Sequence, residues 1–380
     1  MSIEALVEIS RYYGSKSDYV IAGGGNTSFK DKETLYVKGS GTELANAAAE
    51  TFVRMDRKAL AGIWEKTYPE DSAAREKAVL ADLLAAREAG EEQKRPSVET
   101  MLHDLLPNDY VVHTHPALVN GLTCSQQGEK AMKELFAEKA IWIPSTNPGY
   151  ILAQKVKNAQ EDYRAVHGVS ASIIFLQNHG VFVGSGSTEG IKEIYRDIIK
   201  KLENKIKTKP DFSGESRAAP AALSAALTSA LAAALAALSG GKVAFLCNRE
   251  ISGFVKDRAA FYPVSSAFTP DHIVYAGSDP LFYETPNAAG FQEAPLQKAW
   301  GDHVEKTGKP PKIVAVQGLG IFGLGSSEKA ANLAIELFTD AVKVAVFSRA
   351  FGGPLFMSRD QIDFINGWEV EAFRSKVSMK

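Results

Sequence analysis

Pro107-Asn-Asp-Tyr-Val-Val-His113-Thr-His115-Pro116 joins a short apolar run to a pair of histidines. The apolar residues predict a short buried strand, and successive side chains of a strand point to opposite faces. His113 and His115 should therefore emerge on the same face. Neutral imidazoles at this spacing suit zinc or a neighbouring transition metal, but a catalytic site needs one more protein ligand and an open position. The alternative is a pair of partly exposed histidines at the end of a strand.

The composition is that of a soluble, weakly acidic protein. The chain has 380 residues, enough for two domains, with 23% charged residues and a formal net charge of -2. No overall field recruits nucleic acid or acidic lipid. The N-terminus carries Glu4 and Glu8 and no apolar core of a signal peptide. Cys124 and Cys247 are far apart in sequence, so we expect two reduced thiols and a cytoplasmic location.

An uncharged, alanine-rich segment covers residues 218–241. It lacks the density of large apolar residues that a membrane span needs. Leucines recur in it at helical spacing and form a single apolar stripe. We therefore predict a soluble helix, opened by Pro220 and ended by Gly240-Gly241, and we expect it to pack across the junction of two domains.

Two glycine-rich turns precede the histidine pair. The first, Ala22-Gly-Gly-Gly-Asn-Thr-Ser28, can bring backbone N–H groups close to an anion, and its polar side chains offer further donors. The second, Lys38-Gly-Ser-Gly-Thr-Glu43, adds a lysine. Together they could form the walls of a phosphate pocket with Lys38 as a point charge. The spacing of the first turn matches neither the Walker pattern nor the dinucleotide fingerprint. The alternatives are tight strand connections and a solvated loop lysine.

A helix is predicted to start after Arg95-Pro96-Ser97. Ser97 is a natural N-cap, which places Glu99 in the first turn and His103 one turn later on the same face. Near a metal, Glu99 could act as a ligand, as a proton shuttle, or as both in alternation. The alternative for Glu99 is a helix-start carboxylate stabilised by the helix dipole. We expect His103 to pack in the helix and to stay outside the metal ligands.

A third candidate imidazole lies in the segment Ser172–Gly184. This run is apolar apart from Gln177-Asn178-His179. Polar groups inside a buried strand cost free energy unless they are paired or bind something. His179 is therefore the candidate third ligand, and a structural histidine is the alternative.

Five motifs occur in the order seen in the class II aldolase/adducin family, and the resemblance covers about residues 1–207. They are Gly25-Asn-Thr-Ser28, Lys38-Gly-Ser-Gly-Thr42, Pro96-Ser-Val-Glu99, His113-Thr-His115 and Asn178-His-Gly180. The resemblance implies a three-layer α/β/α domain around a mainly antiparallel sheet. It also implies that His113, His115 and His179 hold Zn²⁺, or another divalent first-row metal, and that Glu99 binds or releases the metal and moves the proton. The same resemblance assigns the substrate phosphate to the turns, with the residues Gly25, Asn26, Thr27, Lys38, Ser40, Gly41 and Ser97.

In detail the chain resembles the aldolase part of bifunctional rhamnulose-1-phosphate aldolase/alcohol dehydrogenases. The resemblance implies retro-aldol cleavage of a ketose 1-phosphate, with L-rhamnulose 1-phosphate as the leading candidate, to dihydroxyacetone phosphate and an aldehyde. No dehydrogenase module follows in this sequence, so we expect no NAD chemistry. Val98 departs from the pattern, since fuculose-type members have a hydroxyl there. The alternatives are a sugar-phosphate 4-epimerase or dehydratase with the same metal site, and a non-catalytic adducin-like binding protein.

The C-terminal region looks like a degenerate second copy of the same fold. Ile313–Phe322 lines up with Ile173–Phe182, and Asp271–Gly277 lines up with Asp109–His115. Such matching suggests tandem duplication. It puts Tyr275, Gly277 and Leu319 at the ligand positions, so the second copy should hold no zinc by imidazoles.

We therefore predict a catalytic domain over residues 1–207, a linker with the alanine-rich helix over 208–241 and a non-catalytic domain over 242–380. The alternative is chance similarity between buried strands. The expected partner is a small phosphorylated sugar, with no nucleic acid and no membrane. The family resemblance also implies a homo-oligomer, in which the second half takes the place of a neighbouring subunit.

Overall fold

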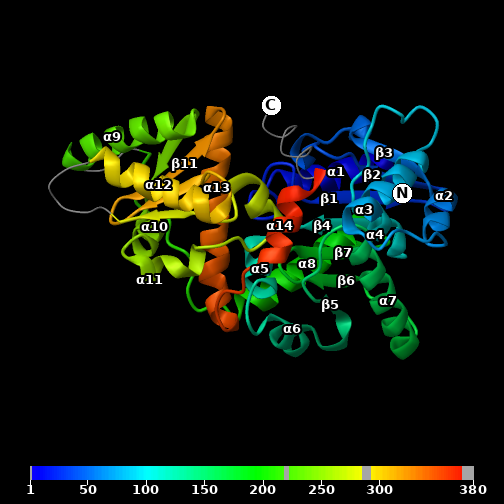
Figure 1. The fold of residues 1–380 in the computed structure, drawn as a ribbon. Helices are drawn as coiled ribbons and strands as arrows, with labels where there is room; N and C mark the ends of the chain where they lie inside the picture. The colour runs from blue at the N-terminus through cyan, green and yellow to red at the C-terminus, as the bar shows by residue number, and fades with distance from the viewer. Residues whose placement is uncertain (1, 218–221, 285–291, 370–380) are drawn as a thin grey trace.

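The computed structural model describes residues 2–217, 222–284 and 292–369, and it contains one β-sheet in each half of the chain (Figure 1). The larger sheet lies in the first half, which we define as residues 2–207. It has seven strands, and within it only β5 and β6 pair in parallel. In sheet order they are β3 (Phe52–Asp56), β2 (Thr34–Lys38), β1 (Asn26–Lys30), β4 (Tyr110–Thr114), β7 (Gly180–Ser185), β6 (Ile173–Leu176) and β5 (Ile141–Ile143).

Helices cover both faces of this sheet. On one face, a core shared with the strands is built from α2 (Arg57–Ile63), α3 (Ser72–Ala85), α4 (Thr100–Leu105) and α7 (Tyr150–His167). The opposite core is built from α1 (Ile3–Gly14), α5 (Ala117–Thr123), α6 (Gly128–Phe136) and α8 (Thr188–Glu203). The expected three-layer α/β/α arrangement around a mainly antiparallel sheet is thus confirmed.

Strand β4 lies in the middle of the sheet, between β1 and β7. Tyr110, Val111 and Val112 are buried, as the apolar run predicts. His113 pairs with Asn26 of β1 on one side and with Phe182 of β7 on the other. The strand ends at Thr114, and His115 follows directly. The two histidines therefore lie at the edge where β1, β4 and β7 meet the loops.

The second half, residues 208–369, has a four-stranded sheet. Its strands, in sheet order, are β8 (Lys242–Leu246), β11 (Gly320–Gly325), β10 (Ile313–Val316) and β9 (Leu281–Tyr283). One face packs on α9 (Ala222–Ser239) and α12 (Glu293–Thr307). The other face packs on α10 (Arg249–Phe254), α11 (Arg258–Phe261), the π-helical segment His272–Ala276, α13 (Glu328–Ser348) and α14 (Arg359–Gly367).

This smaller sheet repeats half of the larger one. The order β8-β11-β10-β9 has the same strand directions as β4-β7-β6-β5. The register is also the same, since Val316 pairs with Gly320 as Leu176 pairs with Gly180. In each hairpin a residue with positive φ occupies the same turn position, Asn178 at 58° in one and a glycine at 70° in the other. This agreement in strand order, direction and register indicates duplication of one domain.

The predicted alignment of Asp271–Gly277 with the histidine strand is wrong. Residues 272–276 form a π-helical segment, and the counterpart of β4 is β8, which pairs with β11. The shared register places Phe245, Cys247 and Leu319 at the three ligand positions, so this copy still offers no imidazole there. The error arose because a short buried apolar run does not distinguish strand from helix.

Helix α9 does not pack across the junction of the two halves, contrary to the expectation from sequence. Its Leu231 and Leu235 are fully buried in a core shared with β8 and β11. Figure 1 shows α9 beside the second half, away from the first. These leucines therefore pack on the smaller sheet, and the helix covers one face of that sheet. Pro220, the expected helix opener, lies outside the described residues. Among the described helices, none has the length and apolar character required to cross a bilayer.

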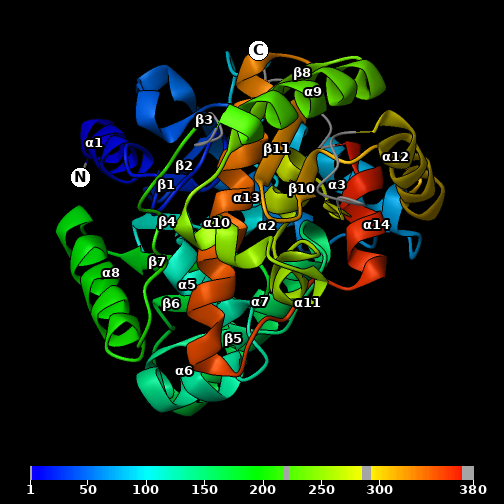
Figure 2. The same ribbon diagram turned by 90° about the vertical axis from the view of Figure 1, so that its left-hand side faces the viewer.

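The two halves share one core, centred on α13. This long helix packs against α5 of the first half (Figure 2). Ala117, the first residue of α5, and Cys124, which directly follows the helix, belong to the same buried cluster as the α13 side chains. A Cβ added at Gly121 would lie 2.4 Å from Phe347 Cβ, so the close approach of the helices requires glycine there. The second half is thus docked firmly beside the histidine strand.

Candidate active site

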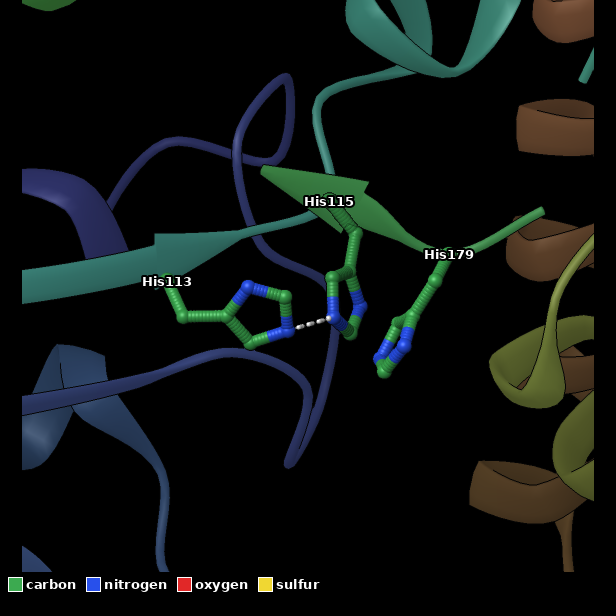
Figure 3. A group of neighbouring side chains, drawn as sticks. All are labelled: His113, His115 and His179. Atoms are coloured by element: carbon green, nitrogen blue, oxygen red, sulfur yellow. Dashed lines mark hydrogen bonds between the residues drawn. The ribbon is translucent and has the colours of Figure 1, made fainter. Parts of the chain in front are cut away.

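Three imidazoles from two separate segments converge at one point. Their ligand nitrogens all lie within 4.8 Å of one another, and His113 Nε2 is 2.8 Å from His115 Nε2. Figure 3 shows His113 on β4, His115 just beyond it and His179 on the turn before β7, with the three rings facing one another. The alternation of strand side chains brings the first pair together, and the β6–β7 hairpin supplies the third.

Hydrogen bonds fix which nitrogen each ring of the pair presents. His113 Nδ1 lies 3.0 Å from the carbonyl oxygen of Val181, which can only accept, so Nδ1 carries the proton. His115 Nδ1 lies 2.5 Å from a carboxylate oxygen of Asp271. His113 Nε2 therefore presents a lone pair, and His115 Nε2 lies 2.8 Å from it as its hydrogen-bond partner. Burial and the neighbouring His115 lower the pKa of His113 well below its usual value, which disfavours an imidazolium.

His179 is held by a turn that the second half anchors. The preceding Asn178 has a left-handed backbone, and its side-chain amide donates to the carbonyl oxygens of Phe268 (3.1 Å) and Leu355 (2.7 Å). Burial lowers the pKa of His179 to about 3. The imidazole is therefore neutral near pH 7, as a metal ligand must be.

The Glu99 carboxylate completes the ring of donors. Its Oε2 lies 3.5 Å from His113 Nε2, and its Oε1 lies 3.6 Å from His179 Nε2. Oε1 is buried and has no hydrogen-bond partner among the described residues. A buried carboxylate oxygen without a partner is costly in free energy. Three imidazoles and one such carboxylate match the donor set of zinc and related metals, so these residues could bind a metal ion.

Asn26 and Ser97 hold this carboxylate in place. Asn26 Nδ2 donates to Glu99 Oε2 at 2.6 Å and to Ser97 Oγ at 3.2 Å. The helix begins at Thr100, with Glu99 itself in the capping position, rather than directly after Ser97. Ser97 Oγ instead accepts from the Glu99 backbone N–H at 3.2 Å. His103 is buried against Asn26 and Ser28, so it packs behind the site, as expected.

A cavity opens beside the imidazoles and the carboxylate. Lys38 is buried, and its Nζ donates to the carbonyl oxygens of Gly23 and Gly25, each at 2.9 Å. It thus bridges the two glycine turns as well as bringing positive charge to the cavity. Six of the seven residues predicted to contact phosphate line this cavity. The full lining is Gly23, Gly25, Asn26, Lys38, Gly39, Ser40, Gly41, Ser97, Glu99, His115, Pro148, His179 and Pro270.

Thr27 is the predicted phosphate residue that does not reach the cavity. Its hydroxyl lies 2.6 Å from Ser10 Oγ of α1, on the opposite side of the sheet. Asn26 and Ser28 point the other way, because side chains alternate along β1. The prediction for Thr27 is corrected accordingly.

The sequence did not point to the contribution from the second half. Asp271 contacts His115, and Pro270 lines the cavity. Both residues are more than 150 positions away from His115 in sequence, and nothing in their local pattern resembles a metal site. Gly24, from the first glycine turn, also has a specific role: an added Cβ would lie 2.8 Å from Asp271 Oδ2.

Comparisons with known proteins agree with this fold. The model of the class II aldolase and adducin N-terminal domain matches residues 4–196. A curated relative, the uncharacterized oxidoreductase YuxG of Bacillus subtilis (strain 168), is 22% identical over 411 residues, which cover 98% of this chain and 58% of the relative. The chain thus spans little more than half the length of that protein.

Solved structures also resemble the chain over about half of its length. An N-terminal class II aldolase domain from Thermoplasma acidophilum is 25% identical, with a TM-score of 0.45, covering 54% of this chain and 93% of that one. An L-fuculose-1-phosphate aldolase from Thermus thermophilus is 16% identical, with a TM-score of 0.32, covering 53% and 89%. On the match of the family model to residues 4–196, the chain belongs to the class II aldolase and adducin family.

Proposed function

We propose that the chain is a zinc-dependent aldolase that cleaves a ketose 1-phosphate, with L-rhamnulose 1-phosphate as the first candidate, to dihydroxyacetone phosphate and an aldehyde. The observation that carries the proposal is the convergence of three imidazoles on Glu99, whose Oε1 is buried and unpartnered among the described residues. The metal identity, the substrate and the cytoplasmic location are part of the proposal.

Each residue of the site has a task in this reaction. A divalent metal held by His113, His115 and His179 would supply a Lewis acid that polarises the substrate carbonyl as the carbon–carbon bond breaks. Glu99 moves the proton, because its Oε1 faces the site while Asn26 holds the other oxygen. His179 would use its free lone pair to hold the metal, so it would not compete for that proton.

The cavity that reaches His115 and His179 also offers donors for an anion. The turn with Gly39, Ser40 and Gly41 lines it together with Ser97, so hydroxyl and backbone donors face the same space as Glu99. Lys38 adds a buried positive charge at the back of this space. These features support binding of the substrate phosphate there, and Val98 leaves one hydroxyl fewer than fuculose-type sites have.

We assign catalysis to residues 1–207 and a non-catalytic role to residues 242–380, with 208–241 between them. The assignment is supported by Phe245, Cys247 and Leu319 at the positions that correspond to the three histidines. We further expect a homo-oligomer, which light scattering on the purified chain would test.

A coupled assay for dihydroxyacetone phosphate tests the activity. The zinc-loaded protein is incubated with a panel of ketose 1-phosphates, and release of dihydroxyacetone phosphate is followed. Release from at least one substrate is expected. Isomerised or dehydrated sugar without release would identify an epimerase or a dehydratase instead. A correctly folded protein that retains no zinc after purification would favour the adducin-like binding role.

A further inference from the structure

The strongest unassigned contact joins the two halves of the chain at the candidate metal centre. Asp271 lies at the start of the π-helical segment, 156 residues from His115, and its Oδ2 is 2.5 Å from His115 Nδ1. Asp271 and the His115 ring are both nearly buried, with side-chain exposures of 8% and 11%. A carboxylate at this distance is a strong, charge-assisted acceptor.

The Asp271 side chain contacts His115 and does not cap its own helix. It occupies the N-cap position of the π-helical segment, yet its side chain makes no capping hydrogen bond within the described residues. The Asp271 backbone is itself helical, with φ of -61° and ψ of -42°, and the His272 N–H donates to Thr269 Oγ1 at 3.4 Å. The Asp271 carboxylate is thus not used as a cap, and its Oδ2 lies against the imidazole.

The first half provides space for this carboxylate. Gly24 has no Cβ, and one built there would lie 2.8 Å from Asp271 Oδ2 and 3.5 Å from His115 Nδ1. The second glycine of the Gly23-Gly24-Gly25 turn is therefore needed for the Asp271–His115 contact. This role is separate from the contribution of the neighbouring glycines to the cavity wall.

The segment that contains Asp271 is also hydrogen-bonded to the turn that contains His179. Phe268, three residues before Asp271, offers its carbonyl oxygen to the Asn178 side-chain amide at 3.1 Å. The same carbonyl accepts from Cys124 Sγ at 3.6 Å. Residues 268–271 thus touch both of the segments that supply imidazoles.

We infer that Asp271 is a positioning residue for the metal centre, by which the second half completes the active site of the first. It accepts the Nδ1–H of His115, holds the ring with Nε2 toward the other two imidazoles and raises the basicity of Nε2. Such partners of ligand histidines contribute about 10- to 100-fold to metal affinity. The inference rests on the proposed metal-dependent function.

Zinc and cobalt binding by the full chain test the inference without a sugar substrate. Metal-free protein is titrated with Zn²⁺ in competition with a chromogenic chelator, and the visible spectrum of the Co²⁺ form is recorded. Asp271→Ala is expected to weaken zinc binding by about 10- to 100-fold and to change the cobalt spectrum. Asp271→Asn keeps an acceptor oxygen but removes the charge. Its zinc affinity should therefore fall less than that of Asp271→Ala, by about 10-fold.

Two further variants sharpen the result. Gly24→Ala should also weaken zinc binding, because its Cβ displaces the carboxylate of Asp271. Asp302→Asn is the matched control, since Asp302 pairs with Lys298 on the exposed surface of α12, and it should bind zinc like the parent.

The outcomes separate this inference from the proposed function. Parent-like zinc affinity and cobalt spectrum in Asp271→Ala would overturn the inference alone. If near-ultraviolet circular dichroism shows that Asp271→Ala does not fold, unchanged zinc affinity in Asp271→Asn overturns it equally. A parent protein that binds no zinc would overturn the proposed function, and this inference with it.

Discussion

Asn26 Nδ2 donates to Glu99 Oε2 over 2.6 Å, so the two oxygens of one carboxylate have different environments. Glu99 Oε2 is held by the side-chain amide of Asn26 in β1. The second, Oε1, faces His179 and has no hydrogen-bond partner among the described residues. A carboxylate arranged in this way can exchange a proton or a metal bond at one oxygen while the other keeps its orientation.

Glu99→Gln should retain much of the metal and lose most of the turnover. The amide is the same size and can still accept from Asn26, but it cannot take a proton. General acid–base catalysis is worth about 10²- to 10⁴-fold, so kcat should fall by about that factor. The measurement is the coupled dihydroxyacetone phosphate assay beside zinc content. Equal turnover in variant and parent would show that another group carries the proton.

His113→Ala should abolish retention of metal through purification. The substitution removes a ligand, and it also leaves His115 Nε2 without the neighbour that lies 2.8 Å away. Zinc content measured by atomic emission tests this expectation. The control is His167→Ala, a histidine at the end of α7 in the same half, which should retain zinc like the parent. Stoichiometric zinc in His113→Ala would place the metal elsewhere.

Lys30 predicts a rise in stability between neutral and alkaline pH. Burial lowers the pKa of Lys30 to about 7, while the unfolded chain has the ordinary value near 10.4. Between these values the unfolded state binds more protons, so the free energy of unfolding increases with pH. From pH 7 to pH 9 the gain should be on the order of 2 kcal/mol.

Urea unfolding of the parent and of Lys30→Met at both pH values measures this effect. Lys30 Nζ donates to the His103 carbonyl oxygen at 2.6 Å, and Lys30 is not among the residues that line the cavity beside the histidines. Methionine has no group that titrates in this range, so the variant should show a smaller rise than the parent. The same rise in both proteins would assign the effect to another residue.

Gly121→Ala should destabilise the contact between the halves. The added Cβ would overlap Phe347 Cβ at 2.4 Å, with the backbone of α13 directly behind it, so neither helix can yield easily. Overpacking of this kind costs about 1–3 kcal/mol, which exceeds the gain of alanine over glycine in a helix. Thermal or urea unfolding measures the loss.

Gly62→Ala, in α2, is the matched control for that prediction. Nothing lies within 4 Å of an added Cβ there, so this variant should be more stable than the parent by about 0.5–1 kcal/mol.

Cys124 gives a second readout for Gly121→Ala, since burial raises the pKa of its thiol to about 12. Alkylation should be slow in the parent and faster where α5 and α13 separate. A Gly121→Ala protein as stable as Gly62→Ala would contradict the interpretation of the contact.

The sequence was sufficient for those parts of the site that follow from local rules. Period-two alternation along β4 predicts that His113 and His115 share a face, and the polar interruption in a buried strand points to His179. The same alternation, applied to β1, would have shown that Thr27 faces away from Asn26. The three-layer fold of the first half followed from the order of the motifs.

The rest depended on contacts between distant segments. Asp271 reaches His115 only because α13 docks the second half on α5, and no local pattern reports such docking. The π-helical segment His272–Ala276 also has the apolar composition of a strand, so the sequence alone placed the counterpart of the histidine strand there instead of at β8. Register in the folded sheets, rather than similarity of apolar runs, identified β8 as the counterpart of β4.

The shared core around α13 constrains how chimeras of this protein can be made. A second half taken from a related chain would have to match the Gly121–Phe347 contact and present an aspartate to His115 at the same time. Grafts that replace residues 208–369 together with α5 should therefore assemble better than grafts cut at the linker alone. Segments exchanged between related chains should therefore keep α5 and α13 together from the same parent.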